Sequence, residues 1–351
     1  MQAFAALSLM ATTLAAMPAA GDECKLAREA VLPVIVDQGR LIVSGAVNNQ
    51  SLRLKVATGT PYSWIMQDSA DRLALPRIQD HLVTKRELKG GRAGGPRTLY
   101  VATIDELALG APAVWRARDL ELPLLDLSNP SDPPNYDGIL GANFWSGYDL
   151  EFDLAHNRLT LFKPQHCEDT ALAYWDGGFE EMDFDSAHKD STLPWLGVTI
   201  NGTPLRAILS SDSNVSILTR EAAARLGVTA DSPGAKPTGS THAVGDDLTE
   251  DFVAPFDAFS IAGESIKHTR LRVGDIYGIR GAENRHSLPD MVLGLDFLTA
   301  HRVMLSYGQR KIYFSYIGGP VFQLTGPRRA YSSVEGNASD ERQKKDAPYP
   351  P

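Results

Sequence analysis

Two stretches of the chain decide its fold: NNQSLRLKVATGTPYSWIM at residues 48–66 and NGTPLRAILSSDSNVSILT at residues 201–219. They align without a gap, and Ala57 then matches Ser210 at an offset of 153 residues. Both begin with an Asn-containing turn, continue as an apolar strand, and end in a loop rich in small hydroxyl residues. A match of this length indicates an internal repeat.

The same offset of 153 recurs twice further along the chain. DGILGANF at residues 137–144 aligns with DMVLGLDF at residues 290–297, and Leu-Gly at 109–110 aligns with Ala-Gly at 262–263. Three motifs in one register indicate that the chain arose by duplication. The period is too long for a solenoid, so it predicts two similar lobes, each within the usual size of a domain.

The pattern within each lobe is typical of β structure. Short apolar or alternating runs separated by Gly, Asn and Asp predict strands; they include residues 41–43, 52–56, 100–104 and 159–162. Helices are expected at residues 68–75 and 219–226, the second with Thr219 as N-cap and Gly227 as its end. We therefore expect a mostly β protein of two homologous, barrel-like lobes.

The repeat also divides the chain. We predict a signal peptide at residues 1–20, an N-terminal lobe at 31–163, an inter-lobe linker at 164–189 and a C-terminal lobe at 190–317. Gly, Pro, Ser and mixed charge predict a disordered tail at 318–351.

The first twenty residues carry no charge and end in small residues, which is typical of a secretory signal peptide. Because no Lys or Arg lies near Met1, an uncleaved membrane anchor stays open as the alternative. Export to the periplasm or the medium would allow Cys24 and Cys167 to form a disulfide. Two unpaired thiols are the other possibility.

Composition excludes several classes of function. A formal net charge of -9 gives no overall basic field for nucleic acid or for anionic lipid. Two cysteines and eight scattered histidines show no metal-ligand spacing, so we expect no metal and no cofactor. We expect a monomer with no membrane contact beyond the signal peptide.

The repeated motifs resemble those of the pepsin and retropepsin superfamily of aspartic proteases, especially bacterial secreted members. In that family each lobe carries an apolar pair, then Asp-Thr/Ser-Gly, and later an apolar-apolar-Gly strand. Here the corresponding stretches are KVATGTPYSWI at 55–65 and ILSSDSNVSIL at 208–218, followed by scaffold glycines Gly141 and Gly294. The resemblance implies a bilobal aspartic-protease fold with an inter-lobe cleft.

The resemblance also implies roles for individual loop residues. Thr58 and Ser211 match the hydroxyl residues that cross-link the two loops, and Gly59 matches a position of close backbone approach. Thr60 and Ser213 complete the cleft loops. Glycine-turn hairpins that close over the cleft are implied at Gly91 and Gly94 in one lobe and at Gly245 in the other.

The chemistry of the family requires an Asp from each lobe, because the two carboxylates share one proton and activate a water molecule. The matched positions in this chain are Ala57 and Ser210. A methyl group accepts no proton, and a serine hydroxyl without an activating base is a poor substitute. The sequence therefore predicts no intact catalytic residue.

Asp212 carries the one carboxylate inside either loop. Three interpretations stay open: a functional acid, a structural acceptor for neighbouring amides, or a loop reshaped after the loss of proteolysis. Asp137 and Asp290 also form a matched pair of acids, for which capping of turns is the expected role.

These observations predict an exported, aspartic-protease-like protein without catalytic activity that binds a peptide or protein ligand in its cleft. The alternative is a working endopeptidase that uses Asp212 or an unaligned acid. An engineered substitution at position 57 is a third interpretation, although the lobe-two loop differs at more than one position.

Overall fold

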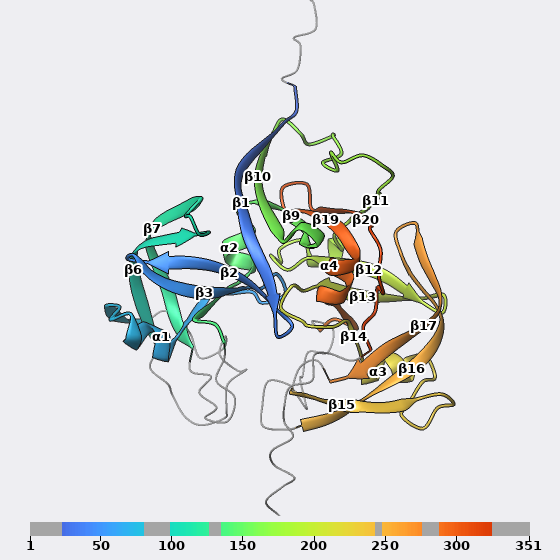
Figure 1. Cartoon of the computed structure of the whole chain (residues 1–351). Coiled ribbons are helices and arrows are strands. Elements are labelled where there is room, and N and C mark those ends of the chain that lie inside the picture. The colour runs from blue at the N-terminus through green and yellow to red at the C-terminus, as the bar shows by residue number, and fades with distance from the viewer. Residues whose placement is uncertain (1–22, 81–98, 126–134, 243–247, 276–287, 325–351) are drawn as a thin grey trace, which may run out of the picture.

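The chain folds into two strand barrels joined by a shared sheet (Figure 1). The structure is a computed structural model, and it describes residues 23–80, 99–125, 135–242, 248–275 and 288–324. The predicted signal peptide and the predicted hairpin glycines, Gly91, Gly94 and Gly245, lie outside these ranges. Strands dominate the described residues, so the prediction of a mostly β, two-lobed fold is confirmed.

The N-terminal barrel contains six strands in the order β2-β3-β8-β4-β7-β6, and pairing of β2 with β6 closes it. Its elements are β2 (Arg40–Val47), β3 (Gln50–Val56), β4 (Trp64–Met66), α1 (Gln67–Arg72), β6 (Leu99–Leu109), β7 (Trp115–Leu125), β8 (Gly138–Leu140) and α2 (Ala142–Trp145). Strand β5 (Arg77–Asp80) extends the sheet beyond β6.

The C-terminal barrel repeats this order as β12-β13-β18-β14-β17-β16, closed by pairing of β12 with β16. Its elements are β12 (Trp195–Ile200), β13 (Thr203–Leu209), β14 (Ile217–Thr219), α3 (Arg220–Arg225), β16 (Leu248–Ile261), β17 (Glu264–Gly274), β18 (Met291–Leu293) and α4 (Leu295–Ala300). Strand β15 (Lys236–His242) takes the place of β5. Strands β3 and β13 begin 153 residues apart, as do β4 and β14, and β8 and β18.

A third group of strands joins the lobes, in the order β11-β20-β19-β9-β10-β1. These strands are β1 (Lys25–Asp37), β9 (Asp149–Asp153), β10 (Arg158–Gln165), β11 (Glu180–Asp183), β19 (His301–Ser306) and β20 (Lys311–Tyr316). Short 3-10 helices, η1 (Leu154–His156) and η2 (Ser186–His188), lie in the connections. Sequence analysis assigned the last strands of each lobe to that lobe. They instead leave the barrels and pair with each other, β9 against β19.

Several predicted boundaries differ from the observed ones. Strand β1 begins at Lys25, before residue 31, because its first half pairs with β10 and its second half with β2. The predicted linker contains β11, which pairs with β20. The predicted tail begins too early, since residues 318–324 pack on the C-terminal barrel, where the rings of Phe322 and Phe259 meet edge-on with 4.9 Å between their centroids.

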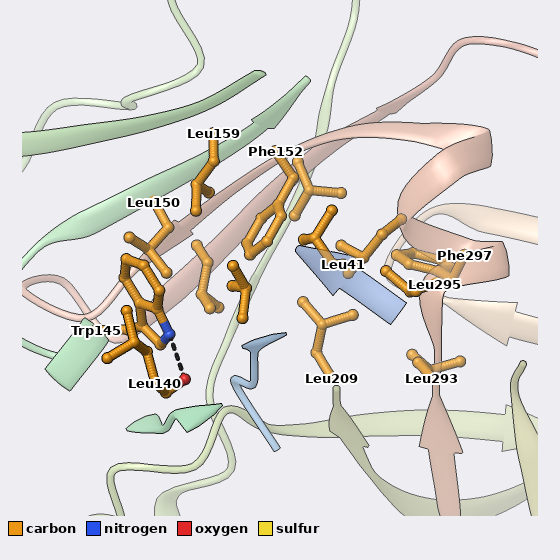
Figure 2. Close-up of a cluster of buried hydrophobic side chains, with 14 of the residues drawn as sticks. Leu41, Leu140, Trp145, Leu150, Phe152, Leu159, Leu209, Leu293, Leu295 and Phe297 are labelled. Atoms are coloured by element: carbon orange, nitrogen blue, oxygen red, sulfur yellow. Dashed lines mark hydrogen bonds between the residues drawn. The ribbon is translucent and has the colours of Figure 1, made fainter. Parts of the chain in front are cut away.

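One hydrophobic cluster runs through both barrels and the shared sheet. Figure 2 shows its centre, where Phe152 and Leu159 of the shared sheet lie above Leu41 and Leu140 of one lobe and Leu209 of the other. All of these side chains are buried. The indole of Trp145 donates to the carbonyl oxygen of Leu140 at 2.6 Å, which satisfies its buried N–H.

The predicted helices occupy matched places after β4 and β14 (Figure 1). Thr219 is the N-cap of α3, and its hydroxyl accepts from the amide of Ala222 at 3.1 Å, as predicted. Gly227 follows the helix with a positive φ of 76°, a conformation that glycine adopts without strain.

Cys24 and Cys167 are joined by a disulfide between the start of β1 and the residues after β10. Within the described part of the chain, no helix is long and apolar enough to cross a bilayer. The described residues also contain no group of three or more His, Cys, Asp or Glu that is arranged to hold a metal ion.

Candidate functional site

Two loops that follow matched strands meet between the barrels: residues 57–60 after β3 and residues 210–213 after β13. We call this region the loop junction. Each loop is fixed from below by a parallel strand, because the amide of Ala57 donates to Leu140 at 2.9 Å and that of Ser210 donates to Leu293 at 2.8 Å. The two loops therefore start from equivalent backbone positions.

Four reciprocal hydrogen bonds cross the loop junction. The amide of Thr58 donates to Ser211 Oγ at 3.1 Å, and the amide of Ser211 donates to Thr58 Oγ1 at 3.0 Å. Each hydroxyl then donates to the opposite strand, Thr58 to the carbonyl of Leu209 at 3.0 Å and Ser211 to that of Val56 at 2.8 Å. Both side chains are fully buried, so every polar atom of the cross-link has a partner away from water.

The scaffold glycines have a steric cause in the same region. A Cβ atom on Gly141 would lie 2.3 Å from the carbonyl oxygen of Tyr62, and one on Gly294 would lie 2.6 Å from the carbonyl carbon of Val215. Tyr62 and Val215 are themselves matched at the offset of 153. The backbone after β8 and β18 thus passes directly beneath each loop, where only glycine fits.

The positions of the expected catalytic acids differ from each other. Ala57 is fully buried and packs with Met66 and Ile139 in a small apolar cluster, to which Trp64 and Tyr136 add partly buried rings. Ser210 is also buried, and its Oγ donates to Asp212 Oδ1 at 2.6 Å. Neither position supplies a carboxylate.

Asp212 is half-buried and reaches across the junction from lobe two to lobe one. Besides Ser210, it accepts from the amide of Gly59 at 3.2 Å and from Thr60 Oγ1 at 2.8 Å. Its matched residue is Gly59, where a Cβ atom would lie 2.4 Å from Ser210 Oγ. These contacts correspond to the structural-acceptor interpretation, because three donors hold both carboxylate oxygens.

Thr60 and Ser213 hold the ends of the loops. The carbonyl of Thr60 accepts from the amide of Ala142 at 2.7 Å, and the carbonyl of Ser213 accepts from that of Leu295 at 2.8 Å. Ser213 Oγ donates to the carbonyl of Val215 at 2.8 Å, a local bond within its own loop. The loops are thus anchored at both ends by the residues that follow β8 and β18.

Asp137 and Asp290 have the turn-fixing role expected from sequence. Asp137 accepts from the amide of Arg53 at 2.7 Å, and Asp290 accepts from that of Arg206 at 2.9 Å. Each also pairs with an arginine of the helix that follows β4 or β14, Arg72 of α1 in one lobe and Arg225 of α3 in the other. Each residue in these contacts of Asp137 lies 153 positions before its counterpart in the contacts of Asp290. The two acids therefore belong to the scaffold that the lobes share.

Sequence analysis missed a row of buried acids on β9: Asp149, Glu151 and Asp153. Burial raises the pKa of Asp149, against hydrogen bonds from Ser306 and Gly308 that lower it. For Asp153, burial also acts to raise the pKa, but hydrogen bonds from Arg158 and His156 outweigh it and lower the value. The alternation of acidic and apolar residues on β9 is visible in the sequence. The sequence does not show that the acidic side of the strand is covered as well as the apolar side.

A second missed acid, Asp296, is buried behind the lobe-two loop. Both of its oxygens accept from the amide of Ser216 at 2.9 Å, and Oδ2 accepts from the amide of Gln323 at 3.0 Å. Burial raises its pKa, against these hydrogen bonds. The matched residue in lobe one is Asn143, which is exposed and accepts from Ser63 Oγ at 2.8 Å.

A groove of about 1010 Å³ lies elsewhere, on the C-terminal lobe between β17, β20 and residues 319–324. Its wall includes Glu264, which lies 2.9 Å from Nε2 of the buried His301. None of its lining residues belongs to the loop junction. This groove and the loop junction are therefore separate features of the molecule.

Comparison with known proteins agrees with this geometry. Residues 196–297, which include the lobe-two loop and β18, match the family model described as aspartyl protease. Together with the two barrels, this match confirms the resemblance to the aspartic protease superfamily. The fold is that of a bilobal aspartic protease.

Solved structures also resemble the chain: 418 chains match it. One is the aspartic proteinase from Irpex lacteus, with 14% sequence identity, a TM-score of 0.48, and alignment over 82% of this chain and 97% of that one. No curated protein has a significant sequence match.

Proposed function

We propose that this protein is a non-catalytic member of the aspartic-protease-like fold that binds a peptide or protein segment at the loop junction. One observation carries the proposal: the four reciprocal hydrogen bonds of Thr58 and Ser211 are complete, while Ala57 and Ser210 occupy the two acid positions. The framework that aligns the loops is present without the groups that perform hydrolysis.

The absence of a carboxylate pair removes the chemistry. A proton-sharing pair acts because one carboxylate takes a proton from water while the other donates one to the peptide carbonyl. Asp212 is a single acid, and its two oxygens already accept from Ser210, Gly59 and Thr60. Removing members of a catalytic unit costs several orders of magnitude in rate.

Binding does not require the missing acids. An extended peptide can be held by main-chain hydrogen bonds and by pockets for alternate side chains, and neither of these needs a catalytic carboxylate. The polar loop residues Gly59, Thr60, Asp212 and Ser213 are partly exposed and line the surface at which we place the ligand.

A second candidate is an endopeptidase that uses Asp212, favoured by the position of this carboxylate at the junction of the two loops. Digestion of a denatured protein and a peptide library, from acid to neutral pH, separates the two functions. We expect no cleavage by the native sequence or by Asp212→Asn, and we expect the native sequence to bind a peptide. Cleavage that disappears in Asp212→Asn would establish the endopeptidase instead.

A constructive test complements that digestion. The combined change Ala57→Asp, Ser210→Asp and Asp212→Gly rebuilds both family motifs on the existing cross-link. Because the loops are already aligned, we expect cleavage in the acid range to appear. The matched control is Ala57→Asp with Ser210→Asp alone, where Asp212 still fills the position that the family gives to glycine.

We also propose export from the cytoplasm. The uncharged apolar segment at residues 1–20 and the bond between Cys24 and Cys167 support this, since such bonds persist in oxidising compartments. Intact-mass analysis of the purified protein is the test. We expect a mature chain that begins near Gly21 and carries no free thiol, whereas retained Met1 with two free thiols would contradict export.

A further inference from the structure

His301 and Glu264 form a buried contact in lobe two, outside the loop junction. His301 is the first residue of β19 and is fully buried, whereas 18% of the Glu264 side chain is exposed, on the wall of the groove in the C-terminal lobe. Nε2 of His301 lies 2.9 Å from Glu264 Oε2, and Nδ1 lies 2.8 Å from the carbonyl oxygen of Phe297. Both ring nitrogens therefore face oxygen atoms.

The two partners of the His301 ring are both acceptors. A carbonyl oxygen and an ionised carboxylate carry no hydrogen, so each contact is a hydrogen bond only when the facing ring nitrogen carries one. Imidazolium has two N–H groups, whereas neutral imidazole has one. The imidazolium form of His301 therefore satisfies both contacts at once. The neutral form leaves a nitrogen lone pair against an oxygen of Glu264 or of Phe297.

Lobe one makes the corresponding contact with different chemistry. Tyr148 matches His301 at the offset of 153, and Trp115 and Glu264 are the first residues of the matched strands β7 and β17. Trp115 Nε1 donates to the hydroxyl of Tyr148 at 3.0 Å. An indole N–H does not titrate, so this contact keeps its donor when histidine changes charge. The fold thus accepts a neutral pair at this place, and an ionisable pair is particular to lobe two.

The contact ties the β16–β17 hairpin to two other elements. Glu264 pairs with Ile261 across the two-residue turn that joins these strands. Phe297 belongs to α4 (Figure 2), and its ring stacks on that of His301 with 4.1 Å between centroids. Phe314 of β20 meets the imidazole edge-on at 5.5 Å. One imidazole ring therefore joins the end of the hairpin to α4 and to the shared sheet.

The other titratable groups around the pair come from four elements. Tyr316 of β20 presents its ring to His301 with 5.7 Å between centroids. Glu180 of β11 accepts from the amide of Gly263 at 2.8 Å, beside Glu264. Asp296 of α4 directs its carboxylate to the amides of Ser216 and Gln323. On β17 itself, three basic side chains line the groove: Lys267, His268 and Arg270.

We propose that His301 and Glu264 form a pH-sensitive latch that holds the end of the β16–β17 hairpin against α4. With His301 protonated, the imidazolium donates to Glu264 and to Phe297, and the latch is closed. As pH rises, the ring gives its Nε2 proton to water, because Nε2 is on the side of the partly exposed Glu264 whereas Phe297 is fully buried.

The opened latch has a defined consequence. The Glu264 carboxylate then faces a lone pair, turns into the groove, and leaves the end of the hairpin without its bond to α4. The latch belongs to the groove and does not rest on peptide binding at the loop junction.

Nuclear magnetic resonance of the disulfide-bonded protein, with labelled histidine and glutamate, tests the proton. The titration covers roughly pH 5 to 8, the range in which histidine changes charge. We expect both ring nitrogens of His301 to carry hydrogen at the acid end and Nδ1 alone at the alkaline end. The carboxyl carbon of Glu264 should shift in the same step. Ring nitrogens that do not change over this range would overturn the latch.

Hydrogen exchange tests the hairpin itself. After correction for the intrinsic pH dependence of exchange, we expect protection of the amides of residues 261–266 to fall about ten-fold from the acid to the alkaline end, as for the loss of one charge-assisted hydrogen bond. The matched hairpin end of lobe one, residues 109–115, is the internal reference and should keep its protection. An equal fall in both hairpins would mean general loosening and would overturn the proposal.

The matched variant is Glu264→Gln. Its amide offers an acceptor to imidazolium and a donor to neutral imidazole, so protection of residues 261–266 should stay constant with pH. Tyr148→Phe, which removes the acceptor of Trp115 in lobe one, is the control and should keep the ten-fold fall in lobe two. A fall that persists in Glu264→Gln overturns the assignment to this pair. If this variant does not fold, as judged by circular dichroism, the titration of the native protein decides.

Discussion

The loop at residues 57–60 and the loop at residues 210–213 each give one hydroxyl and one amide to the other, in a symmetric set of four hydrogen bonds. Beside that symmetric set, the residues diverge in two different ways. Ala57 faces an apolar cluster whereas Ser210 bonds to Asp212, and Gly59 is matched by Asp212 itself. The hydrogen bonds that join the two loops have thus stayed symmetric, whereas the residues at the positions of the expected catalytic acids differ between the lobes.

This difference teaches that the two features are under separate physical constraints. The cross-link is buried, and any loss there leaves polar groups without partners. The acid positions carry no such penalty here, because the methyl group of Ala57 packs in an apolar cluster and the hydroxyl of Ser210 donates to Asp212. The comparison of the lobes can therefore be tested position by position, with each lobe as the control for the other.

The largest effect is expected at the cross-link. Thr58→Val removes the acceptor of the Ser211 amide and the donor to Leu209, leaving two buried groups unsatisfied, and we expect a loss of about 3 kcal/mol in the free energy of unfolding. Ser211→Ala should cost a similar amount. Because either change lets the loops separate, the double variant should cost less than the sum.

Urea denaturation of the two single variants and the double variant measures these losses. Thr203→Val is the control, since it makes the same replacement at an exposed position of β13 and should change stability by less than about 0.5 kcal/mol. Single variants as stable as this control would show that the cross-link contributes nothing.

A second contrast lies between Asp296 and Asn143. Asp296→Asn replaces an acceptor oxygen by an NH₂ group that faces buried amides, so we expect a loss of about 2 kcal/mol near neutral pH. The reciprocal change, Asn143→Asp, adds a charge at an exposed position and keeps the acceptor for Ser63. It should therefore change stability by less than about 0.5 kcal/mol.

The pH dependence sharpens this contrast. Burial raises the pKa of Asp296 in the folded protein. A carboxyl group whose pKa is raised by folding binds protons more readily in the folded state, so its contribution to stability is full below its ordinary pKa and declines as pH rises through the folded value. Asparagine does not titrate, so the free energy lost in Asp296→Asn should shrink across that range. A difference that grows with pH would contradict the assignment.

The third contrast compares the matched acids Asp137 and Asp290. Both accept from a strand amide and pair with a helical arginine, but Asp137 also accepts from Ser69 Oγ at 2.8 Å. We expect Asp137→Ala to cost about 1 kcal/mol more than Asp290→Ala, the usual contribution of one such bond. In denaturation experiments, Ser69→Ala should remove this excess. Equal costs for Asp137→Ala and Asp290→Ala in the protein that retains Ser69 would rule out a contribution from the extra bond.

The two barrels and their register could be predicted from the sequence because the repeat preserves motifs at a fixed offset, from Ala57 and Ser210 to Gly141 and Gly294. It also predicted the Thr219 cap. The shared sheet could not be predicted, because the pairing of β9 with β19 joins residues about 150 positions apart. No motif in either strand indicates which strand it pairs with.

Predictions at the site divide in the same way. The cross-linking role of Thr58 and Ser211 follows from local motifs, whereas the donors to Asp212 come from the opposite lobe and depend on how the loops meet.

The smallest effect is expected at the start of the two matched helices. Thr219 caps α3 through its hydroxyl, whereas Met66, the N-cap of α1, makes no side-chain cap. Thr219→Ala should cost about 1 kcal/mol, and Thr219→Ser, which keeps the acceptor oxygen, should cost much less. Hydrogen exchange gives a local readout, because the amide of Ala222 loses its partner only in the alanine variant and should exchange faster there. Unchanged protection of Ala222 in Thr219→Ala would mean that α3, like α1, is held by packing alone.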